Sequence, residues 1–244
     1  MGLKEPGLRG SLRNVSVGID AIPDSVEYQY VAENFASPWP DEVGDADMSV
    51  NGLGSSTFSN GENSVNGDGS SDDGTADGPQ TLSENQSFGI GITAEYSSVS
   101  SGDAIIAVSH GFDPVLTVRI DSSDGEIRFR VSDDNGNRLR IITDNGFADG
   151  NPHLIVLNKT GDSASDMDIY VDNMETAESV TVDDDDNFDH TNVTMTADMG
   201  FWNRNDGGTL QSDNIAMDAG IFEFKTTAYS EDERKNLKSR RPEV

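Results

Sequence analysis

The chain has 244 residues and a formal net charge of −29, with Asp about twice as frequent as Glu and five lysines among its 16 basic residues. So acidic a body excludes nucleic acid and anionic membranes as its main partners, because both repel negative charge, and it leaves cationic or neutral partners. The absence of cysteine excludes disulfides, thiolate nucleophiles and thiolate metal sites.

The N-terminal third alternates between strand patterns and loop composition. Residues 1–22 contain Gly and Pro without periodicity, and we interpret them as a basic arm outside the domain. Strand patterns begin at Val26 and return around Val50. Residues 59–86 are mainly Ser, Gly, Asp and Asn, which indicates a loop or linker with a short strand near Val65. The N-terminus lacks an apolar core region, so we expect neither a secretory signal nor membrane insertion.

The rest of the chain is a series of alternating strands about 8 to 12 residues apart. The expected strands begin at Phe88, Ala104, Val115, Glu126, Arg138, His153, Met167, Val193 and Gly220. Short Gly-bearing turns at 123–125 and 135–137 fit hairpins, so antiparallel pairing is expected. Ser230 and Glu233 have the spacing of a capping box and predict a short C-terminal helix. The pattern predicts an all-β, two-sheet antiparallel jelly-roll sandwich.

Four short motifs resemble those of concanavalin A-like, laminin G-type jelly rolls. They are Trp39 to Gly44 with its W-x-D core, the strand at 153–156, the segment 169–173, and the terminal strand that leads into Ser230. Pro152 stands where the family has Trp, and Asn173 where it has Gly. The resemblance implies one jelly-roll domain over 23–238 with a basic tail at 239–244. The motifs and the acidic composition are also similar to lectin-like proteins of haloarchaeal tailed viruses.

Catalysis is not expected from these residues. Retaining glucanases of this fold place two carboxylates on one strand as Glu-x-Asp, and no Glu in this chain is followed by Asp two residues later. The three histidines, His110, His153 and His190, are too scattered to predict a triad or a zinc site. We interpret His153 as a strand residue satisfied by packing.

Calcium is the cofactor that the carboxylates could hold. The expected ligands are Asp166, Asp168, Asp172 and Asn173, around a hairpin where the resembled family often binds the ion, since calcium prefers oxygen ligands. Asp183 to Asn187 and the tract from Asp68 to Asp77 are alternatives. Consecutive aspartates are more often a solvated loop than a cage, because alternate side chains point apart.

A sugar site is predicted at Trp202, Asn203, Arg204, Asn205 and Asp206, where an aromatic ring precedes polar side chains. Trp39 is a second candidate. The alternative is that Trp202 belongs to the core and the following residues form a polar turn.

Together these features predict a non-enzymatic, lectin-like module on a halophilic virion surface that adsorbs to a host glycan or glycoprotein. A structural virion protein and an atypical glycoside hydrolase remain as alternatives. Basic residues gather near both ends of the chain, at positions up to 13 and from 234 onward. We expect them to form one patch that docks on other virion proteins or on a second copy of the chain, giving a homo-oligomer.

Overall fold

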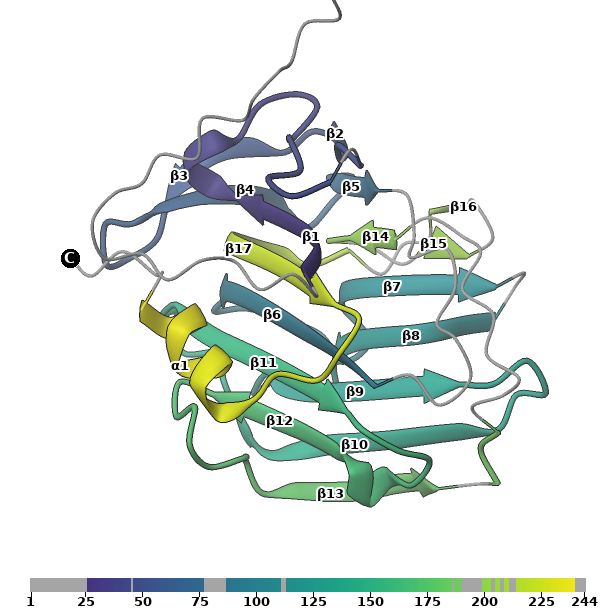
Figure 1. The fold of residues 1–244 in the computed structure, drawn as a ribbon. Helices are drawn as coiled ribbons and strands as arrows, with labels where there is room; N and C mark the ends of the chain where they lie inside the picture. The colour runs from purple at the N-terminus through teal and green to yellow at the C-terminus, as the bar shows by residue number, and fades with distance from the viewer. Residues whose placement is uncertain are drawn as a thin grey trace, which may run out of the picture.

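The computed structural model describes residues 26–44, 46–76, 87–110, 113–185, 187–189, 199–202, 205–206, 209–210 and 214–239. Within these ranges the chain forms two antiparallel sheets packed face to face, and α1 lies against the outer face of one of them (Figure 1). This architecture confirms the predicted all-β sandwich. The arm at 1–22 and the tail beyond Ser239 lie outside the described residues.

The first sheet has seven described strands, in the order β12-β11-β6-β17-β4-β3, with β1 also paired to β17. These strands are β1 (Val26–Val31), β3 (Gly54–Thr57), β4 (Asn63–Asp68), β6 (Phe88–Glu95), β11 (His153–Lys159), β12 (Met167–Val171) and β17 (Ala216–Lys225). Three strands from the beginning of the chain, β1, β3 and β4, therefore share this sheet with the last strand, β17. The turns η1 (Ala32–Asn34) and η2 (Ala164–Asp166) follow β1 and precede β12.

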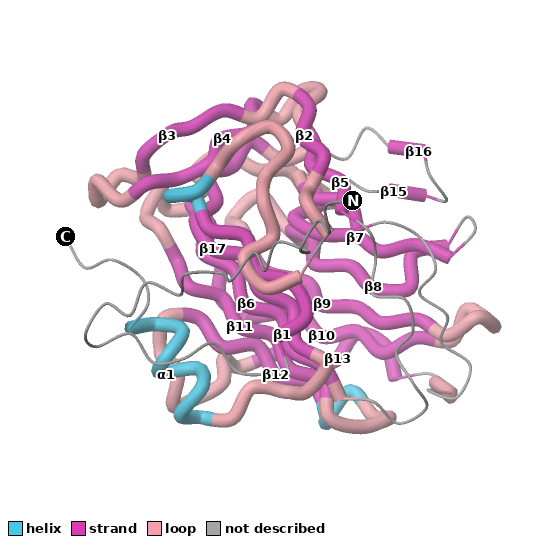
Figure 2. Tube along the Cα trace, turned by 45° about the horizontal axis from the view of Figure 1, so that its top comes forward, coloured by secondary structure: helices cyan, strands magenta, loops and turns pink. Residues whose placement is uncertain are grey.

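The second sheet has eight described strands, in the order β13-β10-β9-β8-β7-β14-β5-β2. These strands are β2 (Ser49–Asn51), β5 (Asp73–Ala76), β7 (Ala104–His110), β8 (Asp113–Ile120), β9 (Glu126–Ser132), β10 (Arg138–Gly146), β13 (Val180–Asp185) and β14 (Met199–Phe201). A separate pair is formed by β15 (Asn205–Asp206) and β16 (Thr209–Leu210). Figure 2 shows the long strands β7 to β10 running beside one another.

The core lies between the sheets and is built by strict alternation. In β6, Phe88, Ile90 and Ile92 are buried in the main apolar cluster, whereas Gly89 and Gly91 face outward. A Cβ added at Gly91 would come within 2.4 Å of Leu237 Cδ2, so the missing side chain is what lets the C-terminal helix approach the sheet.

The helix α1 (Glu231–Ser239) covers the part of that outer face formed by β6 and β12, where Leu237 lies over Gly91 and Arg234 over Tyr170. The predicted capping box is confirmed, because the backbone N–H of Ser230 donates to Glu233 Oε2 at 2.8 Å and the Glu233 N–H donates to Ser230 Oγ at 3.3 Å. Beneath the helix, Lys225 is fully buried and its Nζ lies 2.5 Å from Glu233 Oε1. Helix and sheet are thus joined by apolar contacts and by an ion pair whose lysine is fully buried.

The expected basic patch at the C-terminus is reduced by these contacts. Arg234 is buried, stacks on the Tyr170 ring at 3.8 Å and donates to the Met174 carbonyl. Lys235 is paired with Glu175 and Glu231. Two of the basic residues counted for docking therefore hold the chain's own helix in place.

Two segments predicted as loops are strands. Within 59–86, β4 contains the short strand expected near Val65, and β5 is a strand where a loop was predicted. A Cβ at Gly67 would lie 2.5 Å from Trp202 Cδ1, so this glycine allows close packing. The first three residues of the acidic run at 183–187 belong to β13. There Arg138 and Arg140 of β10 pair with Asp184 and Asp183. Cross-strand charge pairing makes strand structure possible there.

Candidate functional site

The site begins with an interruption along β17. On one edge, β17 pairs with β4 up to Ala219, and with β1 from Ile221 onward. Gly220 lies at the junction, where the end of β1 meets the start of β4. Gly220 is therefore the point at which β17 changes its partner strand.

The opposite edge of β17 is irregular at the same place. Ala219 pairs with Ala94 and Phe222 with Ile92, so Gly220 and Ile221 together face the single residue Thr93 of β6. This is a β-bulge, which bends the strand and leaves part of the ladder unpaired. The coincidence of the bulge with the strand junction produces a hollow over Thr93.

The hollow is a pocket of about 220 Å³, a volume that includes open solvent, and its enclosed part of about 10 Å³ admits one water-sized group. It is lined by Glu33, Phe58, Glu62, Asn63, Thr93, Gly220 and Ile221. Glu33 comes from η1, which lies beside β4 and β17, and Ile221 also touches the apolar cluster under α1. The pocket therefore adjoins the part of the face that the helix covers and opens on the part that it leaves free.

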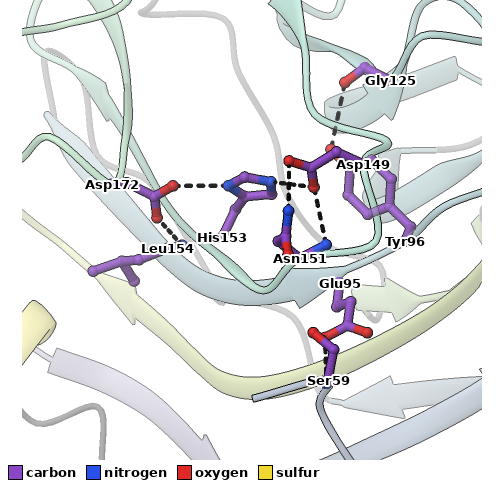
Figure 3. A network of polar contacts seen from close by, with 9 residues as sticks. All are labelled: Ser59, Glu95, Tyr96, Gly125, Asp149, Asn151, His153, Leu154 and Asp172. Atoms are coloured by element: carbon purple, nitrogen blue, oxygen red, sulfur yellow. Dashed lines mark hydrogen bonds and ion pairs between the residues drawn. The ribbon is translucent and has the colours of Figure 1, made fainter. Parts of the chain in front are cut away.

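The β3–β4 turn forms one wall of the pocket and is held in place from both sides. The Ser59 N–H and hydroxyl both donate to Glu95 Oε2, at 2.8 and 3.0 Å (Figure 3). Phe58 lies over Gly220, where an added Cβ would be 2.8 Å from its Cε2. These contacts position the pocket wall before any ligand is present.

The polar groups in the pocket differ in their partners. Thr93 is 1% exposed, and its Oγ1 has no hydrogen-bond partner among the described residues. Glu62 is buried, whereas Glu33 and Asn63 are exposed at the rim. The arrangement offers acceptors at its base and rim beside an apolar ring, as small-molecule sites do.

A second polar network surrounds His153 at the start of β11. Its Nδ1 lies 2.7 Å from Asp172 Oδ2, and its Nε2 lies 3.0 Å from Asp149 Oδ1 (Figure 3). The other oxygen of Asp172 accepts the backbone N–H of Leu154 at 2.9 Å. Both ring nitrogens are engaged by carboxylates, so the imidazole joins two loops. The expectation that His153 is satisfied within the structure is met by polar contacts as well as by packing.

These contacts change the acidity of the groups involved. The hydrogen bond that His153 donates to the Asp172 carboxylate is the main reason that the pKa of His153 is raised, and burial opposes it. The Asn151 amide is the main reason that the pKa of Asp149 is lowered to about 2. Burial raises the pKa of the nearby Tyr96. The network therefore favours an imidazolium between two carboxylates. This arrangement fixes the positions of the two loops that carry Asp149 and Asp172.

Both tryptophans predicted to face a sugar lie in the core. Trp202 is 2% exposed and donates from Nε1 to the Met217 carbonyl, and Trp39 is 1% exposed and donates to the Val31 carbonyl. Their ring centroids are 6.3 Å apart. The structure thus takes the core alternative for Trp202 and corrects the expectation that either indole presents a face to solvent.

The structure describes only some of the polar residues after Trp202. Asn203 and Arg204 lie outside the described residues, as do His190 and Asp77. Asn205 and Asp206 form β15, which pairs with β16. Their role in binding stays a prediction.

The four expected calcium ligands do not meet at one point. Asp166 precedes β12 and Asp172 follows it, so the two are separated by about 20 Å of extended chain. Asp166 closes the capping box of η2, and Asp172 accepts a hydrogen bond from His153. Asp168 lies within β12, and Asn173 follows the strand. Within the described part of the chain, no group of three or more His, Asp or Glu residues could hold a metal ion. The four residues do not form one calcium site. Calcium binding elsewhere in this chain stays a prediction.

The alternative calcium segments are also engaged with protein groups. Asp185 accepts the Ala164 N–H at 3.0 Å, and Asp72 accepts the Asp68 N–H at 2.7 Å. Asp73 pairs with the Asn51 amide. The acidic segments are thereby joined to neighbouring backbone and side chains.

Sequence reasoning missed the Thr93 pocket. Its residues come from four separate segments, and the two signals available were Gly220 inside an apolar strand and the turn residues after Phe58. An isolated Gly in a strand indicates a bulge or a close approach of backbone. Gly220 therefore indicates where a bulge could lie in the strand. It does not indicate which residues of other segments surround that bulge.

Comparison with known proteins supplies the fold. No family model matches the chain, and no curated protein matches it. Among solved structures, the binding domain of Paraclostridial Mosquitocidal Protein 1 matches with a TM-score of 0.64 and 12% identity over 88% of this chain and 52% of that one. A botulinum neurotoxin type C structure, from work on its interaction with two ganglioside molecules, matches with a TM-score of 0.66 and 14% identity over 90% and 52%.

A third neighbour is the Trypanosoma rangeli sialidase, with a TM-score of 0.63 and 9% identity over 88% of this chain and 33% of the enzyme. The shared feature is a lectin-like two-sheet β-sandwich. At these identities the likeness shows the fold alone. The chain spans about half the length of the first two of these structures. The laminin G-type and haloarchaeal resemblances gain no support from these neighbours.

The described chain contains no helix that is long and apolar enough to cross a membrane.

Proposed function

We propose that this chain is a non-enzymatic binding module that recognises a glycan or a glycoprotein. The observation that carries the proposal is the Thr93 pocket, which opens on the uncovered part of the outer sheet face. Sugar hydroxyls can donate to Thr93 Oγ1 and to the carboxylates of Glu33 and Glu62, and can accept from the Asn63 amide. The Phe58 ring supplies the apolar wall that the C–H surface of a sugar requires.

The size and position of the pocket support binding of one sugar unit at a time. The enclosed space of about 10 Å³ admits one hydroxyl or ammonium group at a time, so the sugar ring would lie at the open mouth of the pocket, as the end or a branch of a glycan can. The neighbours whose names describe binding domains support the same class of function for the fold.

Binding without turnover is the second part of the proposal. The chain lacks the Glu-x-Asp strand motif, and both nitrogens of His153 are occupied by carboxylates. Glu33 and Glu62 are the two acids in the pocket, so they are the residues that a hydrolase would need. Sustained release of reducing ends by wild type that disappears in Glu62→Gln would establish the glycoside hydrolase alternative instead.

A glycan array probed with the purified chain tests the binding proposal directly. Retention on at least one class of glycan is expected, and it should be weakened by Thr93→Val without a change of fold. If no glycan retains the protein at micromolar concentration, the proposed function is wrong.

The finer setting that we propose is the surface of a halophilic virion, where the module adsorbs to a host glycan or glycoprotein. The support is composition alone: the net charge of −29 and the scarcity of lysine. Other virion proteins and a second copy of the chain are the proposed assembly partners. Immunolabelling of native particles from a salt-saturated environment would test this setting, and absence of label from every particle would contradict it.

A further inference from the structure

The hydroxyl of Thr93, at the base of the Thr93 pocket, could accept a hydrogen bond from a ligand. A buried hydroxyl without a partner is costly, and native proteins avoid the arrangement unless water or a ligand completes it. Thr93 Oγ1 is in that position among the described residues, at the bulge where β6 faces Gly220. A ligand group with several N–H or O–H donors would complete it.

The charge around that hydroxyl is negative. Among the described residues that line the pocket, two are carboxylic acids, Glu33 and Glu62, and none is basic. On the same face of the sheet, Glu95 lies two residues beyond Thr93 and pairs across the strands with Asp218. A ligand that carries a positive charge would be attracted here, and it would be favoured over a neutral one of the same shape.

An ammonium group matches both features. It has three donors and no acceptor, so it can bond Thr93 Oγ1 and two carboxylate oxygens at once. Charge-assisted bonds of this kind are about twice as strong as neutral ones. The Phe58 ring beside it is compatible with a cation as well as with the C–H surface of a sugar.

We propose that the sugar unit bound in this pocket is an amino sugar with a free ammonium group, as in a glucosamine oligosaccharide. The proposal rests on the proposed glycan-binding function and specifies its ligand. Thr93 and Glu62 contact the ammonium from the base and the wall, and Glu33 contacts it from the rim. N-acetylation of the sugar removes the charge and two of the donors, so the acetylated sugar is discriminated against.

Calorimetric titration with three oligosaccharides of equal length tests the proposal. The probes are glucosamine, N-acetylglucosamine and glucose oligomers, at a salt concentration that keeps the protein folded. The glucosamine oligomer should bind at least about tenfold more tightly than the other two, as a charge-assisted set of bonds predicts. Glu33→Gln, at an exposed position, should reduce that preference without affecting the fold.

Thr93→Val and Thr117→Val form a matched pair of variants. Both threonines are 1% exposed and have an Oγ1 without a partner among the described residues, but Thr117 is in β8 of the other sheet and does not line the pocket. Only Thr93→Val should reduce glucosamine binding, by about tenfold. Equal effects of the two variants would overturn the proposal.

The outcomes separate the proposal from the function on which it rests. If none of a broad set of glycans binds, the glycan-binding function itself fails. If the three oligosaccharides bind equally, or if acetylation strengthens binding, glycan binding stands and the amino-sugar proposal is wrong. If Nα-acetyl-lysine amide binds as tightly as the glucosamine oligomer, the pocket takes a basic peptide and the proposal is again wrong.

Discussion

The imidazole of His153 connects the loop that carries Asp149 with the turn that carries Asp172. Its carboxylate partners are about half exposed, at 53% for Asp149 and 46% for Asp172, so solvent screens part of each ion pair. Because the folded pKa of His153 is raised, its stabilising contribution is complete below the unfolded value near 6.5 and is lost as pH rises through the folded pKa. The His153 network therefore stabilises the fold at acidic pH and loses this contribution at alkaline pH.

His153→Gln should lower the free energy of unfolding by about 1 to 2 kcal/mol at pH 6 and by less at pH 9. The charged pair is present in wild type only at the lower pH. Urea denaturation of both proteins at the two pH values measures the difference. Equal losses at pH 6 and pH 9 would show that the imidazolium contributes nothing beyond packing.

Trp202→Ala should destabilise the fold by about 3 to 5 kcal/mol, since it opens a cavity between the sheets and removes the bond to the Met217 carbonyl. Val182→Ala is a suitable control, because Val182 is 52% exposed and its loss should cost less than about 0.5 kcal/mol. Thermal unfolding monitored by tryptophan fluorescence and circular dichroism compares the two. A Trp202 variant that melts like wild type would place the ring outside the core.

At the scale of elements, α1 decides how much of the outer sheet face is open to ligands. Its Leu237 fits over Gly91, and its Glu233 neutralises the buried Lys225. This pair contributes less than its short distance suggests, because the fully buried Lys225 loses its hydration. The apolar contact is therefore the larger stabilising part of the interface between helix and sheet.

Leu237→Ala should cost about 2 to 5 kcal/mol, the usual range for a fully buried leucine. Asp232→Ala, at an exposed position in the first turn, should cost about 1 kcal/mol or less through the helix dipole. Chemical denaturation of the two variants separates packing from charge. Similar losses in both would mean that α1 is held mainly by electrostatics.

At the scale of the whole molecule, net charge opposes folding. Ion pairs such as Arg138–Asp184 and Arg140–Asp183 are partly exposed and contribute about 0.2 to 1 kcal/mol each. They are few beside a net charge of −29. Repulsion therefore outweighs them at low ionic strength, where the Debye length is about 10 Å at 0.1 M salt.

Stability should rise with salt concentration, because the Debye length falls to about 3 Å at 1 M and repulsion fades before contact-range pairs do. The urea midpoint of wild type measured between 0.1 and 3 M KCl should increase steadily. Sorbitol of equal osmolality serves as the control for exclusion of cosolute. A full β-spectrum and an unchanged midpoint at low ionic strength would contradict both the repulsion argument and the interpretation of the composition as halophilic.

The sequence by itself determined the features that depend on neighbouring residues. Alternation of apolar and polar residues predicted β6, β9 and β11, and the spacing of Ser230 and Glu233 predicted the capping box at α1. Such signals are local, since a strand alternates with period two and a cap spans one turn. The all-β sandwich follows from their sum.

Only the tertiary structure decided which residues meet. Trp202 has the same sequence environment as an exposed aromatic residue, but Gly67 of a strand far away in sequence leaves room for its ring in the core. Thr93 becomes part of a pocket because β17 bulges opposite it and changes partner at Gly220. Pairing between distant strands depends on register across the whole sheet, and no local pattern encodes that register. The candidate site is a product of this long-range pairing.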